Sequence, residues 1–297
     1  MTAAYEKNEP FWKGLLSWQA GFAVISLVGF LFTIVNPDKV PSTGPSSTDR
    51  VAKDLNLVSE SVLDDVKKKA PMKLLAQGNY ADAIAAADKQ LKARPWDVKT
   101  LMAVGDVYCE APKGDKDKGL TILKKSVAMC PESRYIRINY ARHLAAANKL
   151  DDSVAQYELL DKSASEEWTP MRVELANVYL AKNEFSKAVD TLKKAMQNDT
   201  TNGATQELLG LAMARNNDDQ EGFQEFSKGF AVRKVQNDLT ELNAYLAKYN
   251  NSKSNAETNL SKDVKEDPEN QSKEILLMEL LLLENKTKAA KDLLQMN

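Results

Sequence analysis

Two cysteines and one histidine, Cys109, Cys130 and His143, are the residues of this 297-residue sequence best suited to bind a metal or to act as nucleophile and base. The two thiols cannot form a zinc site alone, and the single histidine adds one ligand at most. His143 could serve as a general base in principle, but a lone histidine in a helical sequence is usually a surface or packing residue. We therefore expect no metal, no cofactor and no catalytic residue.

Motifs that are typical of enzymes are absent from the sequence. It contains no glycine-rich phosphate loop, no His-Glu-x-x-His pair and no nucleophile elbow. Acidic and basic side chains are interspersed and the formal net charge is −2, so no basic face is predicted for nucleic acid. These features favour a protein that is not an enzyme and does not bind nucleic acid.

The N-terminal part contains a long apolar run. No charged residue lies between Lys13 and Asp38, and residues 14–36 are rich in leucine, isoleucine, valine and phenylalanine. A helix needs about 20 such residues to cross a bilayer core of roughly 30 Å. Trp12 and Trp18 lie near the N-terminal edge of the run, where indole rings favour the membrane interface. A cleaved signal peptide would have a shorter run and an Ala-x-Ala site, and a core helix would have a polar stripe, so the run predicts a single transmembrane helix.

The flanking segments predict a tail, a linker and a leading helix. Residues 1–13 form the N-terminal tail, and residues 37–48 contain three prolines, which is typical of a flexible linker. Residues 49–71 carry apolar side chains at steps of three and four, which indicates an amphipathic helix. Basic residues are nearly balanced across the apolar run, and the short basic tail favours a cytoplasmic N-terminus. We therefore expect a single-pass membrane protein. Its layout resembles that of bacterial inner-membrane proteins with a large periplasmic domain, which implies a bacterial inner membrane, with the remaining residues in the periplasm.

The rest of the chain, residues 72–297, contains an internal repeat. Similar segments follow a turn residue that recurs at steps of 34 to 36 positions. A period near 34 residues is typical of stacked helix–turn–helix units. The predicted turn residues are Gly78, Gly114, Asn148, Asn183, Asn217, Asn251 and Asn285.

This pattern resembles the tetratricopeptide repeat (TPR) family. Small residues occur where the first helix of a family hairpin packs closely, large residues follow about one turn later, and alanine occurs early in the second helix. A closing proline ends three of the repeats and is missing from the third to fifth. The resemblance implies an all-α fold, a TPR-like right-handed α-solenoid, with Cys109 and Cys130 at opposite ends of one hairpin and too far apart for a disulfide. The small residues are Gly105, Ala141, Ala176 and Gly210, the large ones are Tyr108, Leu144, Tyr179 and Met213, the alanines are Ala83, Ala188, Ala256 and Ala290, and the prolines are Pro95, Pro131 and Pro268.

In the family's geometry, the first helix of each hairpin lines a concave groove, which is the usual binding surface of a solenoid. The resemblance therefore implies a protein-binding groove, while the alternative is that these are ordinary surface positions. The lysine and asparagine cluster with which some members bind a carboxylate is matched by Asn177 alone, so that activity is not transferred. The candidate groove residues are Met102, Asp106, Ile138, Arg142, Val173, Asn177, Glu207 and Leu211.

The helix predicted over residues 275–283 is apolar on nearly every side. Such a helix must be buried on every side. The sixth hairpin and the short helix that follows would cover part of it, and the superhelical twist could cover the rest. If apolar surface is left uncovered, we expect it to contact a partner or a second copy of the chain, with Leu281 and Leu282 as the candidate contact residues.

These features predict a membrane-anchored protein-interaction scaffold or adaptor that assists assembly of a membrane or envelope protein complex. Its protein partner is not identified by the sequence. A first alternative is a stoichiometric structural subunit of a larger membrane complex. A second is an enzyme of unknown type within a helical fold, although no residue pattern indicates one.

Overall fold

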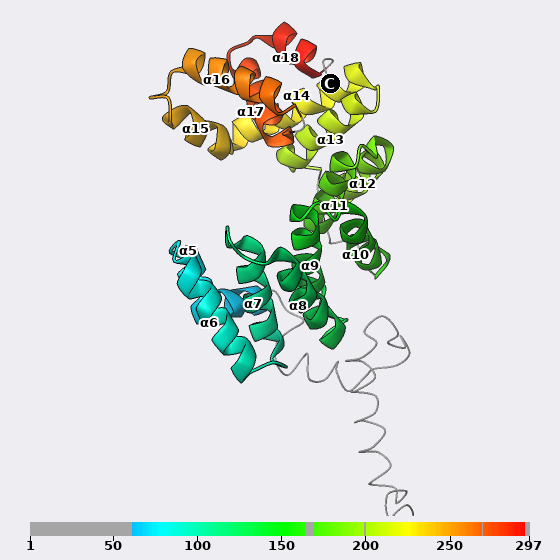
Figure 1. Cartoon of the computed structure of the whole chain (residues 1–297). Coiled ribbons are helices and arrows are strands. Elements are labelled where there is room, and N and C mark those ends of the chain that lie inside the picture. Colours follow the sequence, from blue (N-terminus) through cyan, green and yellow to red (C-terminus); the bar gives the residue numbers. More distant parts are fainter. Residues whose placement is uncertain (1–60, 164–168, 199, 269, 295–297) are drawn as a thin grey trace, which may run out of the picture. The chain divides into compact units, whose positions relative to one another are not determined.

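The computed structural model describes residues 61–163, 169–198, 200–268 and 270–294, and every regular element in these ranges is a helix (Figure 1). Contacts divide the chain into two compact units, Met1–Ala147 and Asn148–Asn297. Within each unit, successive helices pack against one another as antiparallel hairpins that stack on their neighbours. The predicted all-α fold of TPR-like stacked hairpins is therefore confirmed for the described residues.

The helices of both units follow the predicted repeats. In the first unit they are α4 (Ser61–Lys67), α5 (Ala70–Ala76), α6 (Tyr80–Ala93), α7 (Val98–Glu110), α8 (Lys116–Met129) and α9 (Arg134–Ala146). In the second unit they are α10 (Leu150–Ser163), α11 (Thr169–Ala181), α12 (Phe185–Asn198), α13 (Gly203–Arg215), α14 (Asp219–Gln236), α15 (Thr240–Ala247), α16 (Lys253–Glu266), α17 (Gln271–Leu283) and α18 (Thr287–Leu294).

Most of the predicted turn residues adopt the left-handed backbone conformation. Their φ angles lie between 57° at Asn148 and 77° at Gly78. Glycine and asparagine enter this region at the lowest cost among the amino acids, so they end a helix and reverse the chain. Gly114 differs, because it lies in a longer connection where a Cβ atom would come 2.1 Å from the Tyr108 carbonyl oxygen. The other left-handed turn residues of the repeat are Asn183, Asn217, Asn251 and Asn285.

Helices α13 and α14 approach each other backbone to backbone at two pairs of glycines. A Cβ atom on Gly210 would lie 2.4 Å from the amide nitrogen of Phe226, and one on Gly222 would lie 2.6 Å from the Gly210 oxygen. At the second pair, a Cβ atom on Gly229 would lie 2.5 Å from the oxygen of Gly203. No real side chain tolerates such distances, so the hairpin requires glycine at these positions.

The leading segment differs from its prediction. One helix was expected over 49–71, whereas the described part of this range enters two helices, α4 and α5. Pro71 lies in the first turn of α5 rather than after a helix end. Proline is favoured there because its missing N–H would have no partner within the helix in any case.

We correct the predicted localisation as a single-pass membrane protein. Among the helices of the described residues, none is long and apolar enough to cross a bilayer. The predicted tail 1–13, transmembrane segment 14–36 and linker 37–48 lie outside the described residues.

Gly210→Ala tests the close contact between α13 and α14. The added methyl group must displace backbone atoms of α14, so we expect the free energy of unfolding to fall by about 1–3 kcal/mol. In an exposed helix the same change would stabilise by roughly 1 kcal/mol. Thermal unfolding followed by circular dichroism measures the difference, with Gln220→Ala on the exposed side of α14 as the control. An unchanged or higher melting temperature for Gly210→Ala would contradict the contact.

Candidate functional site

A hollow of about 530 Å³ lies on the second unit, and we call it the α13 groove. Its walls come from α11, α13, α15 and α17, the first helices of successive hairpins, and Arg233 of α14 also reaches it. Apolar, amide and acidic side chains all contribute to its lining. The lining residues are Pro170, Val173, Glu174, Asn177, Asn202, Ala204, Thr205, Glu207, Leu208, Arg233, Glu241, Gln271, Ser272 and Ile275.

Local sequence fixes the start of α13 at one end of this groove. Asn202 is the N-cap of the helix, and its side-chain oxygen accepts a hydrogen bond from the Thr205 amide at 3.0 Å. This cap satisfies one of the N–H groups that a helix leaves free at its start. Gly203 follows, and a Cβ atom there would lie 2.6 Å from Cγ of Arg233. The absence of a side chain at Gly203 therefore lets the stem of Arg233 pass close beneath α13.

Arg233 joins two buried carboxyl groups under the groove. Its Nη1 donates to Glu207 Oε2 at 2.7 Å and also to Glu279 Oε1, and its Nε donates to the Asp238 carbonyl oxygen at 2.9 Å. The side chains of Glu207 and Glu279 are each 1% exposed, and that of Arg233 is 10% exposed. The remaining oxygens, Glu207 Oε1 and Glu279 Oε2, are buried, and a side-chain hydrogen bond links the two carboxyl groups.

Burial and mutual repulsion change the titration of these acids. Burial, followed by the charge of Glu207, raises the pKa of Glu279 to about 8. Burial also raises the pKa of Glu207, against the effect of Arg233. Two adjacent carboxylates with one guanidinium cannot easily both ionise in a dry site. The pair of acids therefore keeps, at neutral pH, a proton that Glu279 would lose in water.

A second buried ion pair fixes α17 on α13. Arg215 Nη2 donates to Glu274 Oε2 at 2.5 Å, and the two side chains are 8% and 1% exposed. Glu274 and Glu279 are the acids on an otherwise apolar face of α17, and both are fully buried. Their pairing was not predicted from the sequence, although an acid within a long apolar run is itself a signal of a buried basic partner.

The structure brings three of the eight candidate groove residues together. Val173, Asn177 and Glu207 all line the α13 groove. Leu211 is fully buried within the second unit. In the first unit Met102, Asp106 and Ile138 are buried, and Arg142 is exposed. Contact of these residues with a partner stays a prediction.

His143 lies in a separate cluster in the first unit. Its Nε2 is 3.0 Å from Oδ1 of Asp106, which also accepts a hydrogen bond from Asn139 Nδ2 at 2.7 Å. Burial favours the neutral ring, but the hydrogen bond and charge of Asp106, together with Cys109, raise the pKa of His143 to about 10. The ring is therefore protonated at neutral pH and cannot accept a proton as a general base. Cys109 and Cys130 are both free thiols.

The candidate C-terminal contact is largely covered within the second unit. Leu281 is 5% exposed and belongs to the apolar core formed with α15 and α16, and Leu282 is partly buried against the same core. Helix α18 packs on α17 and also contacts α13 and α14. Leu281 is therefore a core residue, and association through Leu282 stays a prediction.

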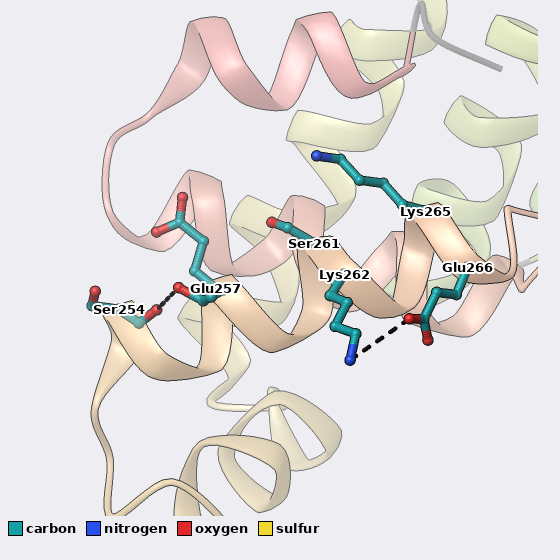
Figure 2. Close-up of a pocket in the computed structure, with 7 residues that line it drawn as sticks. Ser254, Glu257, Ser261, Lys262, Lys265 and Glu266 are labelled. Carbon is teal, nitrogen blue, oxygen red and sulfur yellow. Dashed lines mark hydrogen bonds and ion pairs between the residues drawn. The ribbon is translucent and has the colours of Figure 1, made fainter.

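Another hollow lies along α16, as Figure 2 shows. All of its lining residues, from Ser254 to Glu266, come from this one helix, and Lys262 and Glu266 form an ion pair of 3.6 Å there. Because no side chain from another helix converges on it, it has the character of a solvated helix surface. The α13 groove remains the candidate site.

Comparisons with known proteins match solved structures of MamA. One crystal structure of MamA is 20% identical over 56% of this chain and 96% of the MamA chain, with a TM-score of 0.49. Another is 18% identical over 61% of this chain and 97% of the MamA chain, with a TM-score of 0.48. No protein-family model and no curated protein matches the sequence. At these identities and TM-scores the likeness supports no argument about function, and the fold assignment rests on the helices and turns described above.

The buried acid pair makes the stability of the second unit depend on pH. The pKa of Glu279 is about 8 in the folded chain and near its ordinary value of 4.5 in the unfolded chain. Between these values the unfolded chain has lost a proton that the folded chain keeps, so raising the pH favours unfolding. We expect stability to fall between pH 5 and pH 8, by up to about 1.4 kcal/mol per pH unit for this group.

Glu279→Gln should weaken this pH dependence, because the amide does not titrate. The control Glu221→Gln, at an exposed position on α14, should leave the dependence unchanged. Chemical denaturation at pH 5, 6, 7 and 8 measures the effect. If the free energy of unfolding of the wild type rises from pH 5 to pH 8, and that of Glu279→Gln changes with pH in the same way, Glu279 does not hold a proton in the folded chain.

Leu281→Ala and Leu282→Ala test the packing of α17. Truncation of the buried Leu281 should lower the free energy of unfolding by about 2–5 kcal/mol, and truncation of the partly buried Leu282 by less. Denaturant titration gives both values. If both variants lower the free energy of unfolding by the same small amount, Leu281 is not packed in the core of the second unit. Sedimentation of Leu282→Glu separately tests association through this end.

Proposed function

We propose that this chain is a protein-interaction scaffold and that the α13 groove receives a segment of a partner protein during assembly of a protein complex. The observation that carries the proposal is the groove itself, because helices from four hairpins converge on one hollow of about 530 Å³. Solenoids commonly bind partners on the surface formed by successive first helices.

The composition of the groove supports a peptide as occupant. Asn177 and Gln271 present amide groups that can donate to and accept from a peptide backbone. Val173, Leu208 and Ile275 provide apolar surface for side chains. A few polar groups within an apolar concave site are typical of a surface that binds with defined orientation.

The proposal is for a binding role rather than a catalytic one. The protonated state of His143 supports this view for the residue that could best have acted as a base. In the described ranges, no group of three or more His, Cys, Asp or Glu side chains could hold a metal ion. Partner binding therefore accounts for the groove without requiring a reaction.

Ala204→Trp tests the proposal by filling the groove. Ala204 is exposed on α13 and lines the hollow, so a tryptophan there should block a bound segment without entering the core. We expect partners that co-purify with the full chain, and bind it again as purified proteins, to be lost at least about tenfold, or about 1.4 kcal/mol.

Ser186→Trp on the exposed side of α12 is the matched control and should retain the same partners. Quantitative mass spectrometry identifies the proteins, and binding of each purified partner to the three chains gives the affinity. Equal affinity for wild type and Ala204→Trp would place the interaction elsewhere. A partner that is stoichiometric and insensitive to Ala204→Trp would instead favour a structural subunit.

A further inference from the structure

The four helices at the end of the second unit share an apolar core. Leu242 of α15, Leu260 of α16, Leu280 of α17 and Ala290 of α18 are all buried in it. Phe230, near the end of α14, belongs to the same core. Because these helices pack on one another, we expect them to move together, and we call α15 to α18 the C-terminal block.

Arg233 lies at the junction between this block and the α13–α14 hairpin. The chain passes from α14 to α15 through a short connection, in which Asn237 adopts the left-handed conformation with a φ of 56°. Arg233 Nε donates to the Asp238 carbonyl oxygen of this connection at 2.9 Å. Its Nη1 donates to Glu207 of the hairpin and to Glu279 of the block. One guanidinium group therefore joins the hairpin, the connection and the block.

The acid pair, Glu207 and Glu279, lies beneath the α13 groove and next to its α17 wall. Gln271 and Ile275 of α17 line the groove, and Glu279 follows Ile275 by four residues, so the three share one face of the helix. Glu207 of α13 and Arg233 of α14 are also lining residues. The contact between the two carboxyl groups therefore helps to set how far the α17 wall lies from α13.

We propose that the acid pair is a pH-sensitive switch that controls the width of the α13 groove. While the pair holds a proton, the hydrogen bond between its carboxyl groups keeps α17 against α13, and the groove has a complete wall for a bound segment. When the pair loses this proton, the C-terminal block turns about its junction with α14, and α17 moves away from α13. This inference rests on the proposed function of the groove and adds its regulation.

The charges around the pair determine the direction of the switch. Two carboxyl groups that share a proton attract each other, whereas two carboxylates repel, and Arg233 can balance the charge of one only. Asp238 of the connection and Glu241 of α15 add further negative charge. Loss of the proton therefore leaves an excess of negative charge, which water can stabilise only if α17 moves.

On the other helices packed on α17, the charged groups are paired or reach solvent. Asp263 of α16 pairs with Lys273 of α17 at 3.5 Å, and Glu257 of α16 pairs with Lys286 at 2.5 Å. The charged side chains of α18 are exposed or half-buried, and they are Lys288, Lys291 and Asp292.

The pH range follows from the two states of Glu279. Burial, followed by the charge of Glu207, raises the pKa of Glu279 to about 8 while α17 is docked, and in water the pKa is near its ordinary value of 4.5. Between these values the released state has lost a proton that the docked state keeps. The ratio of released to docked chains therefore rises with pH, by up to about tenfold per pH unit. The glycine contacts between α13 and α14 involve no titrating group, so the hairpin stays intact.

Two nitroxide spin labels across the groove test the switch in the full chain. They are attached at Ala204→Cys on α13 and Ser272→Cys on α17, since both positions are exposed and line the groove. Cys109→Ser and Cys130→Ser in the first unit leave only these two sites to react. Double electron–electron resonance at pH 6 and pH 8 measures the distance between the labels. We expect the ratio of long to short distances to be at least about tenfold higher at pH 8.

Variants of the acid pair identify the group that responds to pH. Glu279→Gln should keep the short distance at both pH values, because the amide can hydrogen-bond to Glu207 and does not titrate. Glu207→Gln should do the same, because Glu279 then has Arg233 to itself, and it provides a second test if Glu279→Gln does not fold. The control Glu221→Gln, exposed on α14, should respond to pH as the wild type does. Circular dichroism checks the fold of each variant.

A second pair of labels, at Ala204→Cys and at Ser186→Cys on α12, separates movement of α17 from unfolding of the whole unit. The distance between these labels should not change with pH, and an equal change at both pairs would reject the switch. A groove distance that is the same at pH 6 and pH 8 would also overturn it. So would a change with pH that persists in Glu279→Gln and Glu207→Gln.

Binding measurements connect the switch to the groove. A partner that Ala204→Trp loses should bind the wild type more tightly at pH 6 than at pH 8, and should bind Glu279→Gln equally at both. If it binds the wild type equally at both pH values, the proposed function stands and its regulation by the acid pair is rejected. Retention of the partner by Ala204→Trp would instead reject the proposed function, while the label distances still decide whether α17 moves.

Discussion

The second unit depends on the contact between the backbones of α13 and α14. Gly210 and Gly222 form one close approach, and Gly203 and Gly229 form the other. Because no side chain separates the helices at these points, Arg233 passes under the first turn of α13 and reaches Glu207. The position of Arg233 in the floor of the groove therefore depends on glycine at these close contacts.

Buried charges then determine how α17 sits on this hairpin. Apolar contact alone does not select one orientation of a helix that is apolar on many sides. The pairs of Arg215 with Glu274 and of Arg233 with Glu279 do so, because each joins a buried acid of α17 to a basic side chain of the α13–α14 hairpin. Moving these charges out of water is costly, and buried pairs often add little net stability. Their contribution here is better understood as specificity of packing.

Much of the fold could be predicted from the sequence because its signals are local. The asparagines and Gly78 that end first helices act through their own backbone conformation, so a period of about 34 residues located them. Depth within the fold was harder to predict. Met102 and Leu211 were placed on the groove by spacing, but both are fully buried because neighbouring helices cover α7 and α13 on more than one side.

The candidate site was predictable only in part for a similar reason. Val173, Asn177 and Glu207 follow from the face of the first helix, and all three line the groove. Arg233 and Glu279 depend on partners far away in the sequence, and spacing within a repeat carries no information about them. Gly203 and Gly229 were also missed, since the family pattern marks one small position per helix and this hairpin has two.

The distance between the paired charges along the chain has a consequence for synthesis. Glu274 lies 59 residues after Arg215, and Glu279 lies 46 residues after Arg233. Chains begin to fold while they are still being translated, with N-terminal parts first. The α13–α14 hairpin is therefore synthesised before the acid that neutralises Arg215 has been made. Translation must pass α17 before the buried charges of the second unit are matched, and any ribosome that stalls within α15 or α16 leaves Arg215 without its partner.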